Sequence, residues 1–511
     1  MAEAPTTIDE LIRHRAVEHP GKPMVIDQTD RLTFAELDAS TRTVAASFLE
    51  AGVTKGTRVG LIMPNGARWV QTALALSRIG AVLVPLSTLL APRELVAQLG
   101  VASVQYLVAV DEFRGHRYID ELRAECRLPT DLPALRAVWT PDELPQATVT
   151  DSIDAVSATV TRADTLVIMF TSGSSGPPKG VIHSHGNALS AVQSGLAARC
   201  INADTRLYLP MPFFWVGGFG SGILSALLAG ATLVTEEIPR PETTLSLLER
   251  ERVSLFRGWP DQAEALARQA DSIGADLSAL RPGSLEALLP PDQRAAPGAR
   301  ATLFGMTEAF GPYCGYPADT DMPKSAWGSC GKPFDGTEVR IVDTDDGSPV
   351  PAETIGMIAI RGPNTLRGIC RRSREQVFTA DGWYLTGDLG HLDEDGFMFY
   401  HGRADDMFKV SGATVYPTEV EQALRSIDGV RNAFVTGVAG QVGAVVVGDG
   451  PIGRLRTSAR KLLSSFKVPT VWLLVDSDDV IPRGGTGKVD VAALKQMLAT
   501  QQEARSPDAD R

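Results

Sequence analysis

The chain has 511 residues, of which 44% are apolar and 22% charged, so it is long enough for a large domain and at least one smaller one. Its formal net charge of -12 and its pI near 5.2 argue against nucleic acid or an anionic membrane as a partner, because surfaces that bind these are basic. An anionic ligand would therefore need local positive groups.

The five cysteines are scattered without a CxxC pair, which indicates neither a zinc site nor a disulfide framework and fits a reducing cytoplasm. The N-terminal segment mixes charged residues into its apolar positions, unlike a signal peptide, and no run approaches membrane-spanning length. The sequence thus predicts a soluble, cytoplasmic protein without membrane insertion.

Strand-like and helical patterns alternate in the first part of the chain. Thr33 and Glu36 form a capping box that opens a helix ending at Gly52. Predicted strands follow at 58–64, 81–87 and 104–110, and predicted helices at 67–80 and 92–100. This alternation is typical of a parallel sheet covered by helices. The proline-punctuated stretch 111–161 is interpreted as a surface connection.

The alternation resumes after residue 187. Strands are predicted at 206–214, 231–235 and 253–258, with an apolar helix at 217–229, and together they indicate a second α/β half of one large domain. The Pro/Ala/Gly-rich stretch 281–300 predicts only a short helical or strand-like piece.

The last third of the chain is predicted to contain more strand. Segments 338–343, 357–362 and 397–402 predict antiparallel sheet, and a helix opened by Pro417 begins a compact α+β part. We therefore expect two domains, 1–402 and 403–511.

The stretch 165–187 carries the first chemical motif. A buried strand, TLVIMF, is followed by the loop TSGSSGPPKG, whose glycines let main-chain N–H groups turn toward one point. Hydroxyls and one lysine add further donors, which suits a polyphosphate; the residues are Thr171, Ser172, Gly173, Ser174, Ser175, Gly176 and Lys179. A flexible linker explains the loop alone equally well, and the pattern is not that of common P-loop NTPases.

Four later motifs each have an ordinary explanation when taken singly. Glu308 in LFGMTE can hold Mg²⁺, which takes oxygen ligands, or can be a solvated residue after a strand. Asp388 in YLTGDLG is predicted to lie in a tight glycine turn, where it can accept ribose hydroxyls. GRADDMFKVSG combines charges at the predicted domain boundary and can also be a charged linker. PRGGTGK puts Lys488 on a glycine loop, where it can be directed at a phosphate or simply solvated.

Together and in this order, TSGSSGPPKG, GMTE, YLTGD, GRADDMFKVSG and PRGGTGK resemble the motifs of acyl-CoA synthetases of the acyl-adenylate-forming superfamily. The resemblance covers nearly the whole chain. It implies an α/β large N-terminal domain, with two α/β subdomains and a β-rich subdomain, and a small mobile α+β C-terminal domain. It also implies ATP, Mg²⁺ and CoA, and a reaction in which a carboxylate first forms an acyl-adenylate that the CoA thiol then attacks.

The resemblance also implies roles for single residues. Catalytic roles fall on Lys488, Glu308, Lys179 and Arg403, and Glu308 with Thr171 would place the metal. Nucleotide contacts fall on the loop residues named above and on Phe304, Gly305, Met306, Thr307, Asp388, Tyr400 and Arg403. Asp405 would be the hinge that exchanges Lys488 for a CoA-binding loop, which contains Lys409, Ser411 and Gly412.

The acyl pocket is expected to include Phe214, Trp215, Gly220, Trp259, Gly305 and Phe310. Large aromatic side chains can cover a bulky apolar acid, although core packing is an alternative for each of them. PFFWVGG contains no acidic residue to hold an α-amine, so an amino acid is disfavoured. A fatty, terpenoid or other polycyclic acid is the predicted substrate class.

The chain departs from its relatives at several positions. GSLEALLPPDQRAAPGAR replaces a Gly-Gly-Ala-Pro-Leu segment that packs against adenine, and Phe304, Leu385, Met357 and Trp215 stand where Tyr, a basic residue, Glu and His are common. One alternative is therefore an enzyme that mainly performs thioesterification on a supplied adenylate.

Other interpretations also stay open. They are an adenylation enzyme that loads a carrier protein, a catalytically inactive nucleotide-binding or regulatory protein, and a luciferase-like oxidase. Besides a small carboxylic acid and CoA, a carrier protein or a second copy of the chain stays open as a partner.

Overall fold

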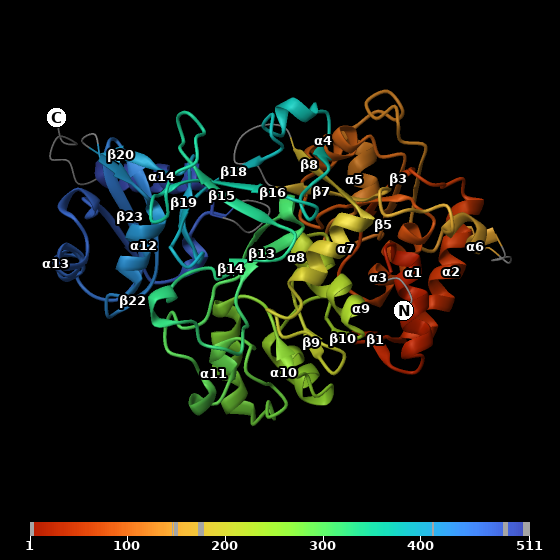
Figure 1. Ribbon diagram of the computed structural model, residues 1–511, viewed down its shortest axis with the longest axis horizontal. Coiled ribbons are helices and arrows are strands. Elements are labelled where there is room, and N and C mark those ends of the chain that lie inside the picture. The colour runs from red at the N-terminus through yellow and green to blue at the C-terminus, as the bar shows by residue number, and fades with distance from the viewer. Residues whose placement is uncertain are drawn as a thin grey trace. The chain divides into compact units, whose positions relative to one another are not determined.

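The computed structural model describes residues 5–145, 147, 152–171, 178–410, 413–483 and 489–503 (Figure 1). The chain forms two compact units. The first comprises Met1–Val339, Ile360–Tyr384 and Gly396–Met398, and the second Arg340–Ala359, Leu385–Asp395 and Phe399–Arg511. The expected domains 1–402 and 403–511, with a hinge near Asp405, stay a prediction.

The first unit contains a seven-stranded mixed sheet that confirms the predicted first α/β half. The pairs β7/β4, β4/β3, β3/β5 and β5/β6 are parallel, whereas β8 pairs antiparallel with both β7 and β17. In spatial order the strands are β17 (Gly368–Ile369), β8 (Lys179–Ser184), β7 (Thr165–Thr171), β4 (Val82–Pro85), β3 (Arg58–Ile62), β5 (Tyr106–Ala109) and β6 (Ala137–Trp139).

Some helices of this half begin at a residue whose side chain caps the first turn, namely Thr7, Thr33 and Ser184. Helix α2 has Thr33 as its N-cap, and the side chains of Thr33 and Glu36 each bond the other residue's backbone N–H, which confirms the predicted capping box. The helices are α1 (Ile8–Glu18), α2 (Phe34–Glu50), α3 (Ala67–Arg78), α4 (Pro92–Ala102), α5 (Tyr118–Glu125), α6 (Ser152–Ser157) and α7 (His185–Ser194).

The interpretation of 111–161 as mere connection is wrong. Besides α5 and α6 it contains β6, which extends the sheet beyond β5 and stacks Trp139 on Tyr106 with ring centroids 4.9 Å apart. The strand escapes pattern analysis because it has only three residues and its pairing partner lies about thirty residues away.

A five-stranded sheet forms the second α/β half of the first unit. Strands β11, β9, β10 and β1 are parallel, and β2 pairs antiparallel with β1. The order is β11 (Leu255–Phe256), β9 (Arg206–Tyr208), β10 (Thr232–Val234), β1 (Pro23–Ile26) and β2 (Arg31–Thr33). Its helices are α8 (Val216–Gly218), the π-helix η1 (Phe219–Leu224), α9 (Ser225–Ala229), α10 (Pro241–Arg250) and α11 (Pro260–Ile273).

One hydrophobic cluster joins the two halves of the first unit. It contains Leu61 and Leu83 from the seven-stranded sheet, Val25 and Leu233 from the five-stranded sheet, and Trp69 of α3 between them. All five side chains have no more than 1% exposed surface. The two sheets therefore share a core and form one large unit.

Shorter elements complete the first unit. A three-stranded sheet consists of β12 (Phe304–Met306), β13 (Gly311–Gly315) and β14 (Lys332–Pro333). The stretch 281–300 contains two short 3-10 helices, η2 (Glu286–Leu288) and η3 (Pro291–Gln293), as expected. The remaining 3-10 turns are η4 (Thr307–Ala309), η5 (Lys324–Ala326) and η6 (Arg374–Gln376).

The C-terminal third is rich in strand. A four-stranded sheet has the order β15 (Glu338–Val342), β16 (Gly356–Arg361), β18 (Tyr384–Leu392) and β19 (Met398–Arg403). Strand β20 (Phe408–Val410) pairs antiparallel with β21 (Ala413–Val415), and a three-stranded sheet joins β22 (Val430–Val438), β23 (Gln441–Gly448) and β24 (Val471–Val475). The helices are α12 (Pro417–Arg425), α13 (Ile452–Leu462) and α14 (Val491–Glu503), with 3-10 turns η7 (Ser465–Lys467) and η8 (Asp478–Val480).

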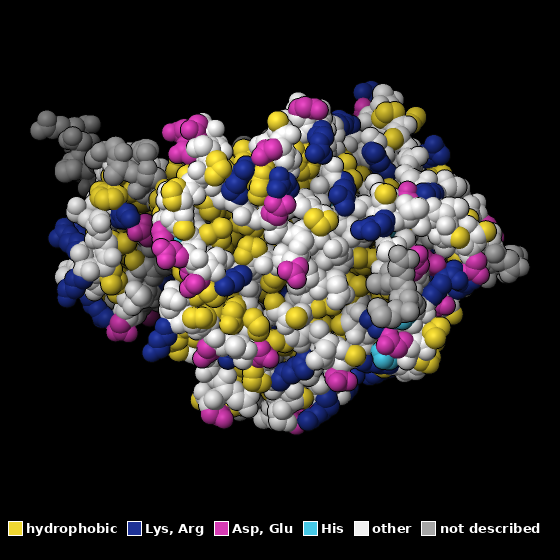
Figure 2. Space-filling view, in the orientation of Figure 1, with side chains coloured by type: hydrophobic (Ala, Val, Ile, Leu, Met, Phe, Trp, Pro, Cys, Tyr) yellow, Lys and Arg dark blue, Asp and Glu magenta, His cyan; other side chains and the backbone are white. Residues whose placement is uncertain are grey.

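The surface mixes both signs of charge. On the face in Figure 2, lysines and arginines lie interspersed with aspartates and glutamates. Among the described residues, no helix is both long and apolar enough to cross a bilayer.

Candidate active site

Strands β7 and β8 form the two sides of the predicted phosphate loop. Their antiparallel register pairs Thr171 with Lys179, so the end of β7 and the start of β8 lie side by side. The apolar run before the loop is a buried strand, as predicted. Ser172, Gly173, Ser174, Ser175 and Gly176 lie outside the described residues, so their predicted phosphate contacts stay a prediction.

Lys179, Glu308 and Tyr384 meet in one polar cluster of the first unit. The Lys179 ammonium forms an ion pair with Glu308 Oε1 and lies 2.6 Å from Tyr384 Oη. Tyr384 Oη donates to the same Oε1 atom at 2.9 Å. The Glu308 side chain is 5% exposed and that of Lys179 22%. The structure thus brings together two of the predicted catalytic residues, and Glu308 is not a solvated residue.

Glu308 is held by its backbone as well as by its side chain. It lies in the turn η4, directly after β12, and its carbonyl accepts a 2.7 Å hydrogen bond from Leu366 N. The carbonyl of the preceding residue, Thr307, lies 2.8 Å from Nε2 of His183 on β8. The carboxylate is therefore aimed from a rigid turn.

His183 is a neutral hydrogen-bonding group in this network. Burial lowers its pKa to about 4, and Asn187 donates to its Nδ1 at 2.8 Å. Neutral imidazole has one donor and one acceptor nitrogen, so Nε2 carries the proton and donates to Thr307 O. Asn187 also donates to the carbonyl of Asn364. These two side chains tie β8 and α7 to the turn that carries Glu308.

The strand before Glu308 requires a glycine. A Cβ on Gly305 would lie 2.3 Å from the carbonyl oxygen of Gly311, so β12 and β13 approach more closely than any side chain permits. Phe304, which packs edge-to-face on Tyr313, is half-buried, as are Met306 and Thr307. The predicted nucleotide residues of this motif therefore share one short segment beside Glu308.

Two aromatic groups occupy the region predicted to bind the acyl chain. Trp215 packs edge-to-face on Phe214 and on Trp259, with ring centroids 5.7 and 6.3 Å apart. Trp259 is 39% exposed, whereas Phe214 is only 7% exposed. The two tryptophans present accessible aromatic surface, and Phe214 lies mainly in the core behind them.

Gly220 and Phe310 meet in a second aromatic group. A Cβ on Gly220 would lie 3.2 Å from the ring of Phe310, which is buried and adopts a left-handed backbone with φ of 53°. The Phe310 ring also packs edge-to-face on His183, with centroids 4.8 Å apart. The predicted acyl residue Phe310 is thus linked through His183 to the turn of Glu308.

In the second unit, Arg403 contacts both predicted carboxylates. Its Nη1 lies 3.3 Å from Asp388 Oδ1 and its Nε lies 3.1 Å from Asp405 Oδ1. Burial alone would lower the pKa of Arg403, but these two carboxylates raise it. Arg403 therefore holds the predicted ribose-binding aspartate and the predicted hinge aspartate at the same time.

The prediction of a tight turn at Asp388 is wrong. Residues 384–392 form the continuous strand β18, and Gly387 adopts a φ of 76° inside it. A Cβ on Gly387 would lie 2.8 Å from Arg403 Nη2. The glycine is required by the close approach of the guanidinium, which the sequence pattern does not distinguish from a turn.

The other predicted residues of the second unit are only partly described. Tyr400 is half-buried on β19, and Lys409 lies on β20, with its side chain outside the described residues. Ser411, Gly412 and Lys488 lie outside the described residues altogether. Their predicted roles in CoA binding and adenylation stay predictions.

Sequence reasoning missed three residues of the site. The sequence motifs that contain His183, Asn187 and Tyr384 do not indicate a role for these side chains. Tyr384 and His183 bond residues 205 and 124 positions away along the chain, so no local pattern reports their contacts. Their only signal was position within the VIHSHGN and YLTGD segments.

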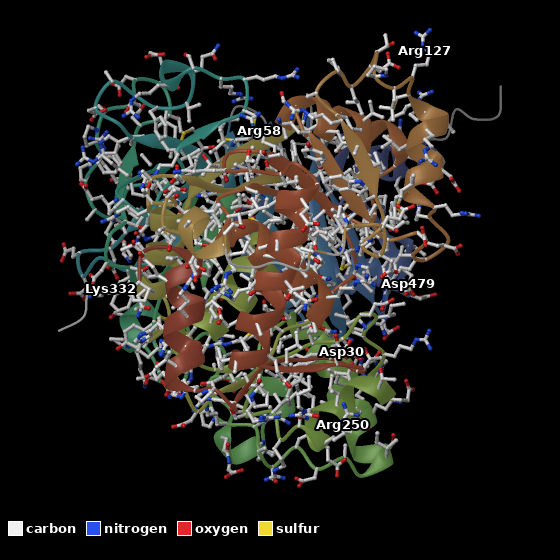
Figure 3. The ribbon with its side chains drawn as sticks, turned by 90° about the vertical axis from the view of Figure 1, so that its right-hand side faces the viewer. Asp30, Arg58, Arg127, Arg250, Lys332 and Asp479 are labelled. Atoms are coloured by element: carbon white, nitrogen blue, oxygen red, sulfur yellow. The ribbon has the colours of Figure 1, made fainter. Side chains whose placement is uncertain are left out.

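A separate cavity of about 500 Å³ lies at the N-terminal ends of β3, β4 and β7, away from the phosphate loop that follows β7. Its lining includes Lys55, Arg58 and Asp164, and Arg58 begins β3 (Figure 3). Lys55 and Asp164 form an ion pair at 2.7 Å. None of the predicted site residues lines this cavity.

Sequence comparisons identify a family and several long relatives. The family described as AMP-binding enzyme matches residues 12–370. A 3-[(3aS,4S,7aS)-7a-methyl-1,5-dioxo-octahydro-1H-inden-4-yl]propanoyl:CoA ligase of Mycobacterium tuberculosis is 32% identical, over 96% of this chain and 98% of the relative. A feruloyl-CoA synthase of an Amycolatopsis species is also 32% identical, over 90% of this chain and 92% of the relative.

Comparison of structures gives the same fold. An anthranilate CoA ligase in complex with anthranoyl-AMP superimposes with a TM-score of 0.81 at 23% identity, covering 97% of this chain and 98% of that one. ATP-bound MatB from Rhodopseudomonas palustris gives a TM-score of 0.78 at 24% identity, covering 96% and 99%. From the family match and the long relatives, the chain belongs to the AMP-binding enzyme family, in the acyl-adenylate-forming superfamily, and is an acid–thiol ligase of the acyl-CoA synthetase type.

Proposed function

We propose that this ligase joins a bulky, ring-bearing apolar carboxylic acid to CoA and performs both half-reactions itself. The proposal rests on the cluster of Lys179, Glu308 and Tyr384, in which Lys179 begins β8, directly after the predicted phosphate loop. A lysine and a carboxylate placed side by side can each receive one part of a metal-bound triphosphate. The intact pair favours adenylation on this protein over thioesterification alone.

In the first half-reaction the substrate carboxylate attacks the α-phosphorus of ATP and pyrophosphate leaves. Lys179 would move from Glu308 to the β- and γ-phosphates, where its charge offsets theirs. Asp388 would accept the ribose hydroxyls, and its ion pair with Arg403 would hold that carboxylate in place. Lys488 would approach the α-phosphate and the attacking carboxylate. The second half-reaction is attack of the CoA thiol on the acyl carbonyl, which releases AMP.

The residues fit a magnesium ion that is held mainly by its substrate. The described residues contain no group of three or more His, Cys, Asp or Glu side chains suited to a metal. Mg²⁺ in nucleotide sites takes one or two protein ligands and completes its shell with phosphate oxygens and water. Glu308 and the Thr171 hydroxyl would supply those ligands, and the bound ion would neutralise phosphate charge.

The substrate class is inferred from the tryptophan pair and from the relatives. Trp215 and Trp259 offer flat, accessible faces, which favour a ring over a small polar acid. The two similar ligases act on a bicyclic propanoyl group and a feruloyl group, both of which contain rings. Among the fatty, terpenoid and polycyclic acids predicted from the sequence, these features favour ring-bearing acids over open-chain fatty acids.

A panel of acids with two readouts tests the proposal. Fused-ring, aromatic, long-chain, small and amino acids are each assayed for pyrophosphate release without CoA and for thioester with CoA. We expect both products with ring-bearing acids. Thioester formation only from a supplied adenylate would favour the thioesterification variant, and transfer to a phosphopantetheinylated carrier protein but not to CoA would favour the carrier-loading enzyme.

Trp215→Ala gives the structural test of the acyl pocket. We expect kcat/KM for the preferred ring acid to fall about ten-fold, which corresponds to the loss of one aromatic contact surface, while KM for ATP stays unchanged. Trp139→Ala is the matched control, because Trp139 stacks on Tyr106 in the edge strand β6. Equal losses in both variants would contradict a role of Trp215 in acid binding.

A further inference from the structure

We propose that Tyr384 is a positioning residue that holds Glu308 ready for the metal while Lys179 transfers from the carboxylate to the nucleotide. This inference rests on the proposed function of the Lys179 and Glu308 pair and adds a residue that acts through it. Tyr384 itself need not touch ATP.

The geometry gives the Tyr384 hydroxyl two opposite tasks. Its oxygen lies 2.6 Å from Lys179 Nζ and 2.9 Å from Glu308 Oε1. An ammonium only donates and a carboxylate only accepts, so the hydroxyl accepts from Lys179 and donates its proton to Glu308. A phenylalanine or an aliphatic residue cannot do either. The hydroxyl therefore bridges the two charged groups.

The ring is fixed well enough to aim this hydroxyl. Tyr384 is 6% exposed, its ring packs edge-to-face on Phe378 at 6.4 Å, and Lys179 Nζ lies 5.2 Å from its centroid. A buried ring with such contacts has few alternative rotamers. The hydroxyl thus stays in place when its partners move.

Without Tyr384, the departure of Lys179 would leave the buried Glu308 carboxylate without a hydrogen-bond donor on Oε1. A nearly buried carboxylate that loses its cationic partner and keeps no hydrogen-bond donor is energetically unfavourable. Because Lys179 and Tyr384 both bond Oε1, Tyr384 keeps a donor on that oxygen after Lys179 leaves, and Oε2 is the oxygen that would bind the ion. The tyrosine therefore lowers the cost of the exchange from ion pair to metal ligand.

The test is the affinity for ATP at a series of Mg²⁺ concentrations, measured by calorimetry without acid or CoA. For Tyr384→Phe we expect the dissociation constant of MgATP to rise about ten-fold, as for loss of one hydrogen bond to a charged group. The Mg²⁺ concentration for half-maximal binding should rise with it. Tyr384→His, which restores a polar ring atom, should recover part of the loss.

Tyr208→Phe is the matched control. Tyr208 also donates to a buried glutamate, Glu236, at 2.6 Å, but on the five-stranded sheet. We expect it to lower the melting temperature without changing the dependence on Mg²⁺. A merely structural Tyr384 would behave in the same way, so a dissociation constant for Tyr384→Phe within two-fold of wild type would overturn the inference.

A double-mutant cycle tests whether the loss of MgATP affinity in Tyr384→Phe acts through Glu308. In the Glu308→Gln background, removal of the Tyr384 hydroxyl should change MgATP affinity by less than two-fold, because its acceptor no longer carries charge. A full ten-fold effect in that background would overturn the inference. Failure of the acid panel alongside a Mg²⁺-dependent loss in Tyr384→Phe would reject the proposed function alone, and a wild-type chain without MgATP affinity would reject both.

Discussion

Two buried glutamates of the first unit differ in what surrounds them. Glu236 is fully buried and accepts from neutral donors, Tyr208 at 2.6 Å, Thr243 at 2.9 Å and Thr244. Glu308 also accepts from a tyrosine, but its second partner is the Lys179 cation beside the phosphate loop. A carboxylate satisfied by fixed neutral donors stabilises the fold, whereas one paired with a single long side chain can exchange partners.

Substitution of the two glutamates should separate catalysis from stability most clearly. Glu308→Gln removes the charge that the metal and Lys179 require, so we expect pyrophosphate release to fall about 1,000-fold with little change in melting temperature. Glu236→Gln brings an amide donor against the hydroxyl donors, so the free energy of unfolding should fall by about 2 kcal/mol with near-normal turnover. The two assays are pyrophosphate release and urea unfolding. A large kinetic loss in Glu236→Gln would remove the distinction.

Acid should destabilise β8 and the start of α7, which carry His183 and His185, before it destabilises α10 beside Glu236. Burial lowers the pKa of both His183 and His185 to about 4. Between the ordinary histidine pKa of about 6.5 and this value, the unfolded chain takes up protons that the folded chain does not. Stability is therefore complete above about pH 6.5 and is lost as the pH falls toward 4, by about 3 kcal/mol for each histidine.

Urea unfolding at pH 7.5, 5.5 and 4.5 measures this loss. In His185→Gln the dependence on pH should become about half as steep, whereas the same change at the exposed His14 of α1 serves as the control. Hydrogen exchange at pH 5 should rise first in 179–187 and later in α10, which carries Thr243 and Thr244. Earlier exchange in α10 would contradict the assignment of the acid-sensitive groups.

Some residues of the Glu308 cluster can be predicted from the sequence and others cannot. Glu308 was predicted from a motif, because the motif is contiguous and its chemistry is carried by residue type. Tyr384, whose hydroxyl contacts both Lys179 and Glu308, belongs to a different motif. Its role depends on the fold, which brings it beside Lys179. Strand β1 was missed for the same reason, since Val25 pairs with Leu233 more than 200 positions later.

Local physics also explains the correct and the wrong predictions of structure. The Thr33 capping box and the buried run of β7 were predicted because their signals are complete within a few residues. Gly387 was assigned to a tight turn, although it is a strand residue with positive φ beside the Arg403 guanidinium. The pattern Thr-Gly-Asp fits a tight turn and a strand with one positive-φ glycine equally well. The contact with Arg403, 16 positions later, decides between the two.

Neutralising the lysine rather than the glutamate should have the smallest of these effects. Lys179→Met removes the charge that would reach the phosphates but leaves the Tyr384 donor on Glu308, so we expect KM for ATP to rise about 30-fold while residual turnover persists. Lys55→Met is the matched control, because it breaks a lysine–aspartate ion pair at the other end of the same sheet. Its KM for ATP should stay within two-fold of wild type. If Lys179→Met instead unfolds the protein while KM is unchanged in the folded fraction, the Lys179–Glu308 pair would be structural, and the two glutamates would belong to one class.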